Sequence, residues 1–131
     1  MNHPKRVQSI DIEVRVRYAE CDAQNMAHHS VYPVWMEMAR TELLRARGMA
    51  YRDMEANGVY FVVARMSLRY RLPARYDDVL RVQVKVRHSG AIKIDHDYEI
   101  YRDDELLASG QTTLVCIDTD RKVQRIPKEL R

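Results

Sequence analysis

The segment from Ser30 to Gly48 restricts the fold of this chain more than any other part of the sequence. Its apolar residues recur at three-to-four-residue spacing, which is typical of a helix: Val31, Val34, Trp35, Met38, Ala39, Leu43 and Ala46. Tyr32 and Met36 widen the apolar arc well beyond the stripe of a surface helix. The sequence therefore predicts one long helix that other elements must surround.

The sequence contains residues that are expected to start and to stop this helix. Ser30 is the expected N-cap, and Pro33 then falls in the first turn, where its missing N–H costs little. Gly48 is the expected stop. The side expected to face solvent carries polar residues: Glu37, Arg40 and Thr41.

Most of the remaining chain alternates apolar and polar residues, which is typical of half-buried strands. Strands are expected over residues 7–18, 60–71, 80–87, 92–100 and 106–117, with a last short strand near 123–126. Residues 49–58 are expected to form a short helix or an irregular crossing. Hairpin-length turns imply antiparallel neighbours. The simplest result is an α+β fold, a curved sheet of five to six strands wrapped around one helix, with residues 1–131 as a single domain.

Charge and cysteine content narrow the class of protein. A net charge of +3 is weaker than the clustered basic surface of a nucleic-acid-binding protein, although it suits a polyanionic small ligand. Cys21 and Cys116 form no C-x-x-C pair, which favours a reducing compartment over a disulfide framework. No apolar stretch approaches the ~20 residues of a membrane span. We expect a soluble, cytoplasmic protein.

Asp22 is the main candidate for chemistry. It lies seven residues before His29, at the expected start of the long helix. The first N–H groups of a helix have no internal partner and suit a carbonyl on which negative charge develops. A nearby carboxylate could act as general base or as nucleophile. The alternative is that Asp22 is a loop residue that accepts local backbone hydrogen bonds.

Glu37 and Tyr18 have two interpretations each, and His96 has one. Glu37 is a rival acid on the helix, or an ion-pair partner of Arg40 or Thr41. Tyr18 could hydrogen-bond Asp22, or only pack as the last inward residue of the first strand. His96 is expected to be a core histidine with satisfied hydrogen bonds.

A metal site and a phosphate-binding site are two further possibilities. His28 and His29, with Cys21 and Asp22, lack the spacing of a metal site, so no metal is expected. A basic stripe either contacts phosphates or forms a solvated strand face: Arg65, Arg69, Arg71 and Arg75. The chain has no glycine-rich phosphate loop and no G-x-S-x-G elbow.

Several motifs resemble the 4-hydroxybenzoyl-CoA thioesterase family of hotdog-fold proteins, over nearly the whole chain. They are Tyr18-x-x-x-Asp22-Ala23, His29-Ser30-x-Tyr32, Glu37-x-Ala39-Arg40-x-Glu42-x-Leu44-Arg45, Val62-Val63-x-x-Met66, Pro73-Ala74-Arg75-x-Asp77-Asp78-x-Leu80, Val115-Cys116-Ile117-Asp118 and Ile126-Pro127-Lys128. Within that family the chain is most similar to the bacterial short-chain acyl-CoA thioesterase branch associated with the Tol–Pal envelope cluster.

The resemblance implies roles for matching positions. Asp22 stands at the catalytic aspartate, and Tyr18 at a tyrosine proposed to assist it. His29 stands where the helix-start amide polarises the thioester carbonyl, and where this branch has a functional histidine. The family forms homodimers, often paired into homotetramers, with active sites between protomers. It uses no cofactor, because coenzyme A is part of the substrate.

The chain departs from the family beside the proposed site. Gln24 and Asn25 replace glycines that often follow the Asp-Ala pair, and His28 replaces an aromatic residue. Asn can adopt the left-handed conformation, whereas Gln24 adds bulk. The residues expected to bind substrate are His28, Ser30, Tyr32, Gln24, Asn25 and Arg65.

The expected function is hydrolysis of the thioester of a short-chain or aromatic acyl-CoA, or of acyl-carrier protein. Two rivals stay open at the level of sequence. One is a hotdog dehydratase or hydratase, for which no clear second acid–base residue is present. The other is a non-catalytic acyl-CoA-binding protein.

Overall fold

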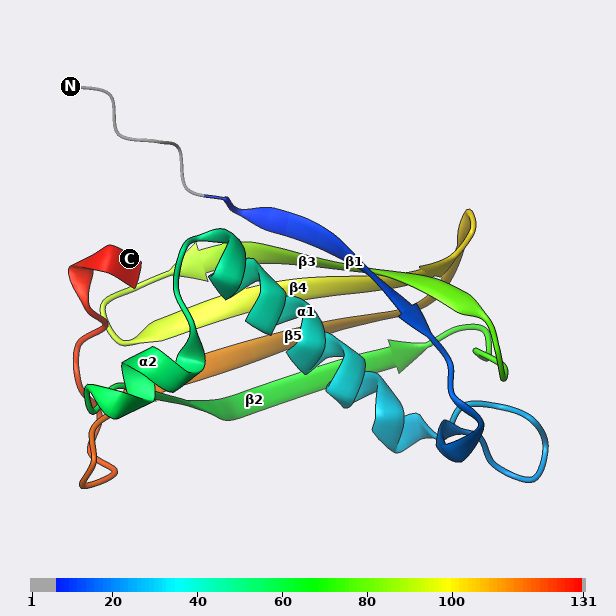
Figure 1. The fold of residues 1–131 in the computed structure, drawn as a ribbon, viewed down its shortest axis with the longest axis horizontal. Coiled ribbons are helices and arrows are strands. Elements are labelled where there is room, and N and C mark those ends of the chain that lie inside the picture. The colour runs from blue at the N-terminus through cyan, green and yellow to red at the C-terminus, as the bar shows by residue number, and fades with distance from the viewer. Residues whose placement is uncertain (1–6, 131) are drawn as a thin grey trace.

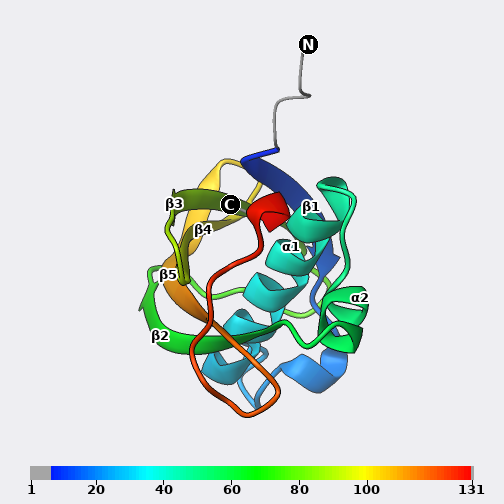
Figure 2. The same cartoon turned by 90° about the vertical axis from the view of Figure 1, so that its left-hand side faces the viewer.

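One curved sheet of five antiparallel strands forms the body of the computed structural model, which describes residues 7–130 (Figure 1). The strands are β1 (Ser9–Arg15), β2 (Tyr60–Tyr70), β3 (Val79–Ser89), β4 (Lys93–Arg102) and β5 (Glu105–Ile117). Their order in the sheet is β1-β3-β4-β5-β2, so β1 and β2 are the edges. Figure 2 shows the sheet curving around the long helix α1 (Tyr32–Ala46). The predicted α+β arrangement is confirmed.

Strands β3 and β4 alternate as their sequences predict. Every second side chain is buried: Leu80, Val82, Val84 and Val86 on β3, and Ile94, His96, Tyr98 and Ile100 on β4. Each large apolar side chain buried in this way contributes roughly 1.5–3 kcal/mol. The inner face of the sheet therefore holds α1 in place.

The buried face of α1 differs from the predicted one. Its members follow helical spacing: Tyr32, Trp35, Met36, Ala39, Arg40 and Leu43. Val34 and Met38 were expected inside but are 49% and 45% exposed, whereas Arg40 was expected outside and is 8% exposed. The apolar arc is wider than the one sheet that covers it, so the apolar pattern alone did not determine which part faces the sheet.

A glycine terminates the long helix α1, two residues after Ala46. Gly48 has φ +82°, and the N–H groups of Gly48 and Met49 donate to the carbonyls of Arg45 and Leu44. This is a Schellman motif, which only a residue tolerant of positive φ can close without strain. The predicted stop at Gly48 is confirmed. The segment expected as a short helix or irregular crossing contains the short helix α2 (Tyr51–Ala56).

Edge strand β2 contains an irregularity that the sequence did not predict. Its register against β5 shifts between Val63 and Arg65. The shift changes which residues face inward, because Phe61 before it and Leu68 after it both pack against the core. The prediction of one uniform alternation from Tyr60 to Tyr70 was therefore wrong.

The predicted strand at 123–126 is also absent from the part of the chain that the structure describes. Val123 makes only an isolated bridge with Ile117, and Ile126 is buried without belonging to a strand. The sheet has five strands rather than six. Among residues 7–130, no helix combines the length and the hydropathy needed to cross a membrane.

Candidate active site

The loop between β1 and α1 is closed by backbone hydrogen bonds. Cys21 and Ala27 form an isolated bridge, and the Asp22 N–H donates to the Met26 carbonyl at 2.9 Å. The Asn25 N–H donates to the Asp22 carbonyl at 3.1 Å, and Asn25 has φ +62°. Asn25 thus adopts the left-handed conformation that the sequence analysis considered open to an Asn, so this departure from glycine leaves the tight loop intact.

The Asp22 carboxylate uses one oxygen within the loop. Its Oδ1 accepts hydrogen bonds from the N–H groups of Gln24 at 2.8 Å and Met26 at 3.2 Å. These bonds are the local role that the alternative interpretation predicts. Among residues 7–130, no hydrogen bond engages Oδ2. The loop therefore orients the carboxylate and leaves one oxygen available for chemistry.

The exposed Asp22 side chain borders a hollow of about 450 Å³. The other lining residues are Tyr18, Cys21, Ala23 and Asn25. Among residues 7–130, none of those that line this hollow comes from the turn His29–Val31. In a single chain, Asp22 and His29 thus lie close in the sequence, but they do not line one shared cavity.

The start of the helical region is built differently from the prediction. A 3₁₀ turn, His29–Val31, precedes α1, and His28 is its N-cap: Nδ1 of His28 accepts from the Ser30 N–H at 3.2 Å and lies 2.7 Å from Ser30 Oγ. Ser30 is therefore not the N-cap of α1, which begins after Val31 with Pro33 in its first turn. Pro33 has no N–H for the His29 carbonyl four residues earlier, which favours the tighter turn. His29 opens this turn, where an N–H has no internal acceptor.

Two tyrosines hold this turn against the rest of the fold. The Tyr70 hydroxyl donates to the His29 carbonyl at 2.8 Å, and the Tyr70 ring meets the Tyr32 ring edge-on at 5.0 Å. Tyr32 is buried, and its hydroxyl accepts from the Ala74 N–H at 3.2 Å. Tyr32 was expected to bind substrate, and in the structure its hydroxyl binds the backbone of Ala74. Tyr70 was missed, because its partner lies 41 residues away in the sequence.

Tyr18 does not occupy the predicted position. Strand β1 ends at Arg15, and Tyr18 opens a 3₁₀ turn with its side chain 80% exposed. Its ring meets Tyr76 edge-on at 5.5 Å, and no hydrogen bond from it to Asp22 occurs in the described structure. The expected inward packing was wrong, because the chain turns before Tyr18. Tyr18 forms a wall of the Asp22 hollow instead.

A buried acid, Glu20, ties the loop to the helix, and sequence reasoning missed it. Oε1 accepts from the Arg17 N–H at 2.7 Å, and Oε2 accepts from Trp35 Nε1 at 3.3 Å. The Arg17 guanidinium also pairs with Oε2 at 3.3 Å. Buried carboxylates are rare unless paired, and these partners account for this one. No local sequence signal pointed to Glu20, because Trp35 lies 15 residues away in the sequence.

The other predicted residues lie outside this cluster. Arg65 lies midway along β2 opposite Thr113, and does not line the Asp22 hollow. The predicted basic stripe is exposed throughout: Arg65, Arg69, Arg71 and Arg75. Glu37 pairs with Arg40 at 3.7 Å, which confirms the ion-pair interpretation. Within the described part of the chain, no cluster of three potential metal ligands occurs, and the His28 and His29 rings stack at 4.2 Å.

Comparison with known proteins decides the family. A family model described as the thioesterase-like superfamily matches residues 16–131. The chain belongs to this superfamily. The prediction of a thioester hydrolase is confirmed at this level.

Individual members of the thioesterase-like superfamily support the assignment. The chain is 33% identical to a putative acyl-CoA thioesterase, YneP of Bacillus subtilis, over 82% of this chain and 79% of the relative. It is 32% identical to the acyl-CoA thioester hydrolase YbgC of Escherichia coli, over 89% of each chain. It also resembles the crystal structure of a DHNA-CoA thioesterase from Staphylococcus aureus, with a TM-score of 0.86 and 30% identity over 89% of this chain and 80% of that one. The predicted hotdog fold is confirmed.

Proposed function

We propose that this protein hydrolyses the thioester of a short-chain or aromatic acyl-CoA to a free acid and a thiol. The observation that carries the proposal is the Asp22 carboxylate, which is oriented by two loop N–H groups and keeps Oδ2 free. The names of the relatives YbgC and YneP, and of the Staphylococcus aureus structure, support acyl-CoA as the substrate. Within the superfamily, we place the chain in the 4-hydroxybenzoyl-CoA thioesterase family, in the Tol–Pal-associated branch.

In the proposed reaction, the His29 N–H binds the thioester carbonyl oxygen and stabilises the negative charge that develops on it. Asp22 removes a proton from water, the hydroxide adds to the carbonyl carbon, and the C–S bond breaks as the thiolate leaves. Alternatively, Asp22 attacks the carbonyl and forms a mixed anhydride that water then cleaves. A single turnover in H₂¹⁸O tests the anhydride route in which water attacks the Asp22 carboxyl carbon, because the first product then carries an unlabelled Asp22 oxygen, whereas the general-base route places ¹⁸O in it.

We further propose that a second copy of the chain completes the site. Edge strand β2 and helix α1 both have exposed apolar side chains: Val62, Val63 and Met66 on β2, and Val34 and Met38 on α1. Unpaired edge strands are ready to pair with another chain. Such a homodimer, which could assemble into a tetramer, would cover this surface. Unpaired Cys21 and Cys116 support a cytoplasmic location.

Thiol release from saturated acyl-CoAs of graded length, and from aromatic acyl-CoAs, tests the proposed function. Only a hydrolase releases thiol from a saturated substrate, whereas a dehydratase, a hydratase or a binding protein does not. We expect Asp22→Asn to lower turnover by at least ~10²-fold while the protein stays folded.

The chain contains a matched control for this variant. Asp118 Oδ1 accepts from the N–H groups of Asp120 at 2.8 Å and Lys122 at 3.0 Å, which is the same i+2 and i+4 pattern as at Asp22. Arg121, like Asn25, has positive φ. Asp118→Asn changes the equivalent contacts in a different loop, and it should leave hydrolysis intact. Near-normal turnover of Asp22→Asn would refute the catalytic assignment.

A further inference from the structure

The loop between β2 and β3, residues 71–78, connects the Asp22 loop to the start of α1. The Ala74 N–H donates to the hydroxyl of Tyr32, the first residue of α1, at 3.2 Å. The Ala74 carbonyl accepts from the Ala27 N–H at 2.8 Å. Since Ala74 is fully buried, its backbone fixes the Asp22 loop and the helix start relative to each other.

The contact at Ala27 continues to the Asp22 carboxylate. The preceding residue, Met26, forms an isolated backbone bridge with Arg75 of the β2–β3 loop. The Met26 N–H donates to Asp22 Oδ1 at 3.2 Å, and its carbonyl accepts from the Asp22 N–H at 2.9 Å. A displacement of the β2–β3 loop would therefore displace the carboxylate, because adjacent residues join the two.

An ion pair holds the other side of the Ala74 peptide groups. Arg102, the last residue of β4, donates from Nη1 to Asp78 Oδ2 at 2.8 Å and to the Pro73 carbonyl at 3.1 Å. Asp78 Oδ2 also accepts from the Arg75 N–H at 2.8 Å. The peptide groups before and after Ala74 thus each contact the ion pair on one side and the proposed active site on the other.

The surroundings of this ion pair favour a rigid contact. The Arg102 and Asp78 side chains are only 25% and 21% exposed, respectively. Partial burial strengthens the attraction between charges, and hydrogen bonds between ionised groups are stronger than neutral ones. Arg102 Nη2 also pairs at 3.3 Å with Glu105, the first residue of β5. The guanidinium is thus anchored in the β4–β5 hairpin, which belongs to the sheet.

We propose that Arg102 and Asp78 are positioning residues for Asp22. Their ion pair orients the two Ala74 peptide groups, and these set the position of the Asp22 carboxylate relative to the helix start. The catalytic part of this inference rests on the proposed thioester hydrolysis. A misplacement of about 1 Å can lower turnover by about 10²-fold, so the pair affects the rate without touching substrate.

Steady-state kinetics of Arg102→Gln test the proposal. We expect kcat for a saturated acyl-CoA to fall about 10- to 100-fold, with KM nearly unchanged, because the substrate contacts stay. Arg102→Lys keeps the charge and should recover part of this loss. In an Asp22→Asn background, Arg102→Gln should lower the residual rate by no more than about twofold, because the pair acts through Asp22.

Amide hydrogen exchange tests the same contacts without any activity. In Arg102→Gln, the N–H groups of Met26 and Ala27 should exchange at least about tenfold faster than in the wild type. Asp78→Asn, which keeps an acceptor for the Arg75 N–H, is the second variant if Arg102→Gln does not fold. Unchanged exchange at both amides, or faster exchange with wild-type kcat, would overturn the proposal.

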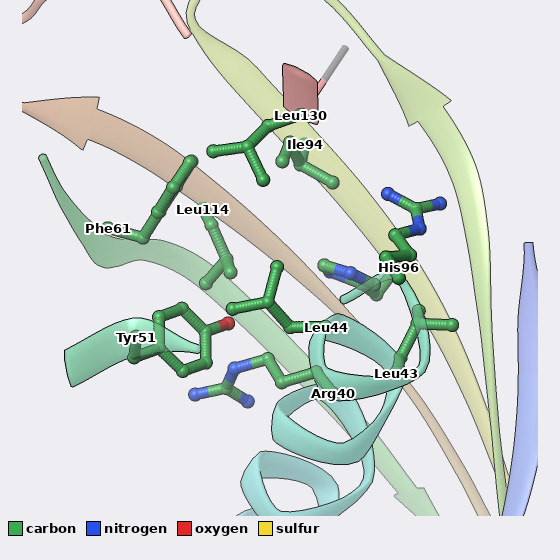
Figure 3. Close-up of a pocket in the computed structure, with 10 residues that line it drawn as sticks. Arg40, Leu43, Leu44, Tyr51, Phe61, Ile94, His96, Leu114 and Leu130 are labelled. Carbon is green, nitrogen blue, oxygen red and sulfur yellow. The ribbon is translucent and has the colours of Figure 1, made fainter. Parts of the chain in front are cut away.

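Two controls separate positioning from a general loss of stability. Figure 3 shows Ile94 among the apolar side chains beside the C-terminal half of α1. Ile94 lies eight residues before Arg102 on β4, which is roughly 26 Å along the strand at 3.3 Å per residue. Ile94→Val removes a buried methyl group, so it should lower Tm but leave kcat and the exchange at Met26 and Ala27 unchanged. Glu105→Gln removes the exposed partner of Arg102 and should behave like the wild type.

The two readouts also separate this inference from the proposed function. If the wild-type protein releases no thiol from any acyl-CoA, the proposed hydrolysis fails. The exchange data then decide by themselves whether the ion pair holds the Asp22 loop.

Discussion

The hydroxyl group of Tyr70, at the end of β2, donates a 2.8 Å hydrogen bond to the main-chain carbonyl of His29. Pro33 cannot supply an α-helical N–H to that carbonyl, so a side chain from the sheet edge contributes a donor. The orientation of the helix start therefore depends on a residue of another element.

Removing this hydroxyl should impair the proposed catalysis with little effect on the fold. We expect Tyr70→Phe to lower kcat about two- to thirteenfold, the equivalent of one hydrogen bond of roughly 0.5–1.5 kcal/mol, with KM nearly unchanged. Steady-state kinetics and a thermal melt measure both effects. Tyr76→Phe, which keeps the ring contact with Tyr18, is the control. Wild-type kcat in Tyr70→Phe would show that the bond has no role in positioning.

A charge on the exposed part of β2 should prevent the proposed dimer. Met66 is 38% exposed on this edge strand, and Met66→Asp would place an unpaired charge in the interface. We expect monomers in light scattering after size exclusion, together with loss of activity. Glu13→Lys, on the opposite edge strand β1, should leave assembly unchanged. Intact dimers of Met66→Asp would argue for a different interface.

His96 should make stability depend on pH below neutrality. Burial, with the charges of Arg40 and Arg47, lowers the pKa of His96 from 6.5 to about 4. Between pH 6.5 and pH 4, His96 therefore binds a proton in the unfolded chain but stays neutral in the folded protein. This contribution to stability is complete above pH 6.5 and decreases as pH falls toward 4, with about 2 kcal/mol lost at pH 5.

Urea unfolding at constant chloride concentration measures this effect. The difference in unfolding free energy between wild type and His96→Gln should shrink by about 2 kcal/mol from pH 7 to pH 5. His88→Gln controls for removal of an exposed histidine. If the difference in unfolding free energy between wild type and His96→Gln stays constant with pH, His96 has the same pKa in the folded and unfolded states.

Gly110 on β5 should not tolerate a side chain. A Cβ there would lie 3.0 Å from the Ser67 carbonyl oxygen, and equally close to Met36 Cε and Leu68 Cδ2. Since the Ser67 backbone belongs to the sheet, Gly110→Ala should destabilise the protein by about 1–3 kcal/mol. In Gly90→Ala the added Cβ would lie 3.4 Å from the flexible His88 ring and 3.7 Å from the Lys93 carbonyl oxygen, so this variant should cost less. Equal melting temperatures for both variants would contradict this packing.

The sequence by itself determined the alternating strands, the long helix and its stop at Gly48, because these depend on residues close together in the chain. It also indicated the Asp22 loop through its motif, and it allowed the left-handed conformation of Asn25. The altered register of β2 was not predictable, because a bulge depends on the partner strand. The cap at His28 instead of Ser30 was missed because Pro33 and Tyr70 act together.

Only the tertiary structure decided which part of the wide apolar arc of α1 faces the sheet. It buried Arg40 and exposed Val34 and Met38. It also brought Glu20 to Trp35 and Tyr70 to His29. Such contacts join residues distant in sequence, and the free energy that selects them comes from packing the whole sheet against the helix, which no local pattern contains.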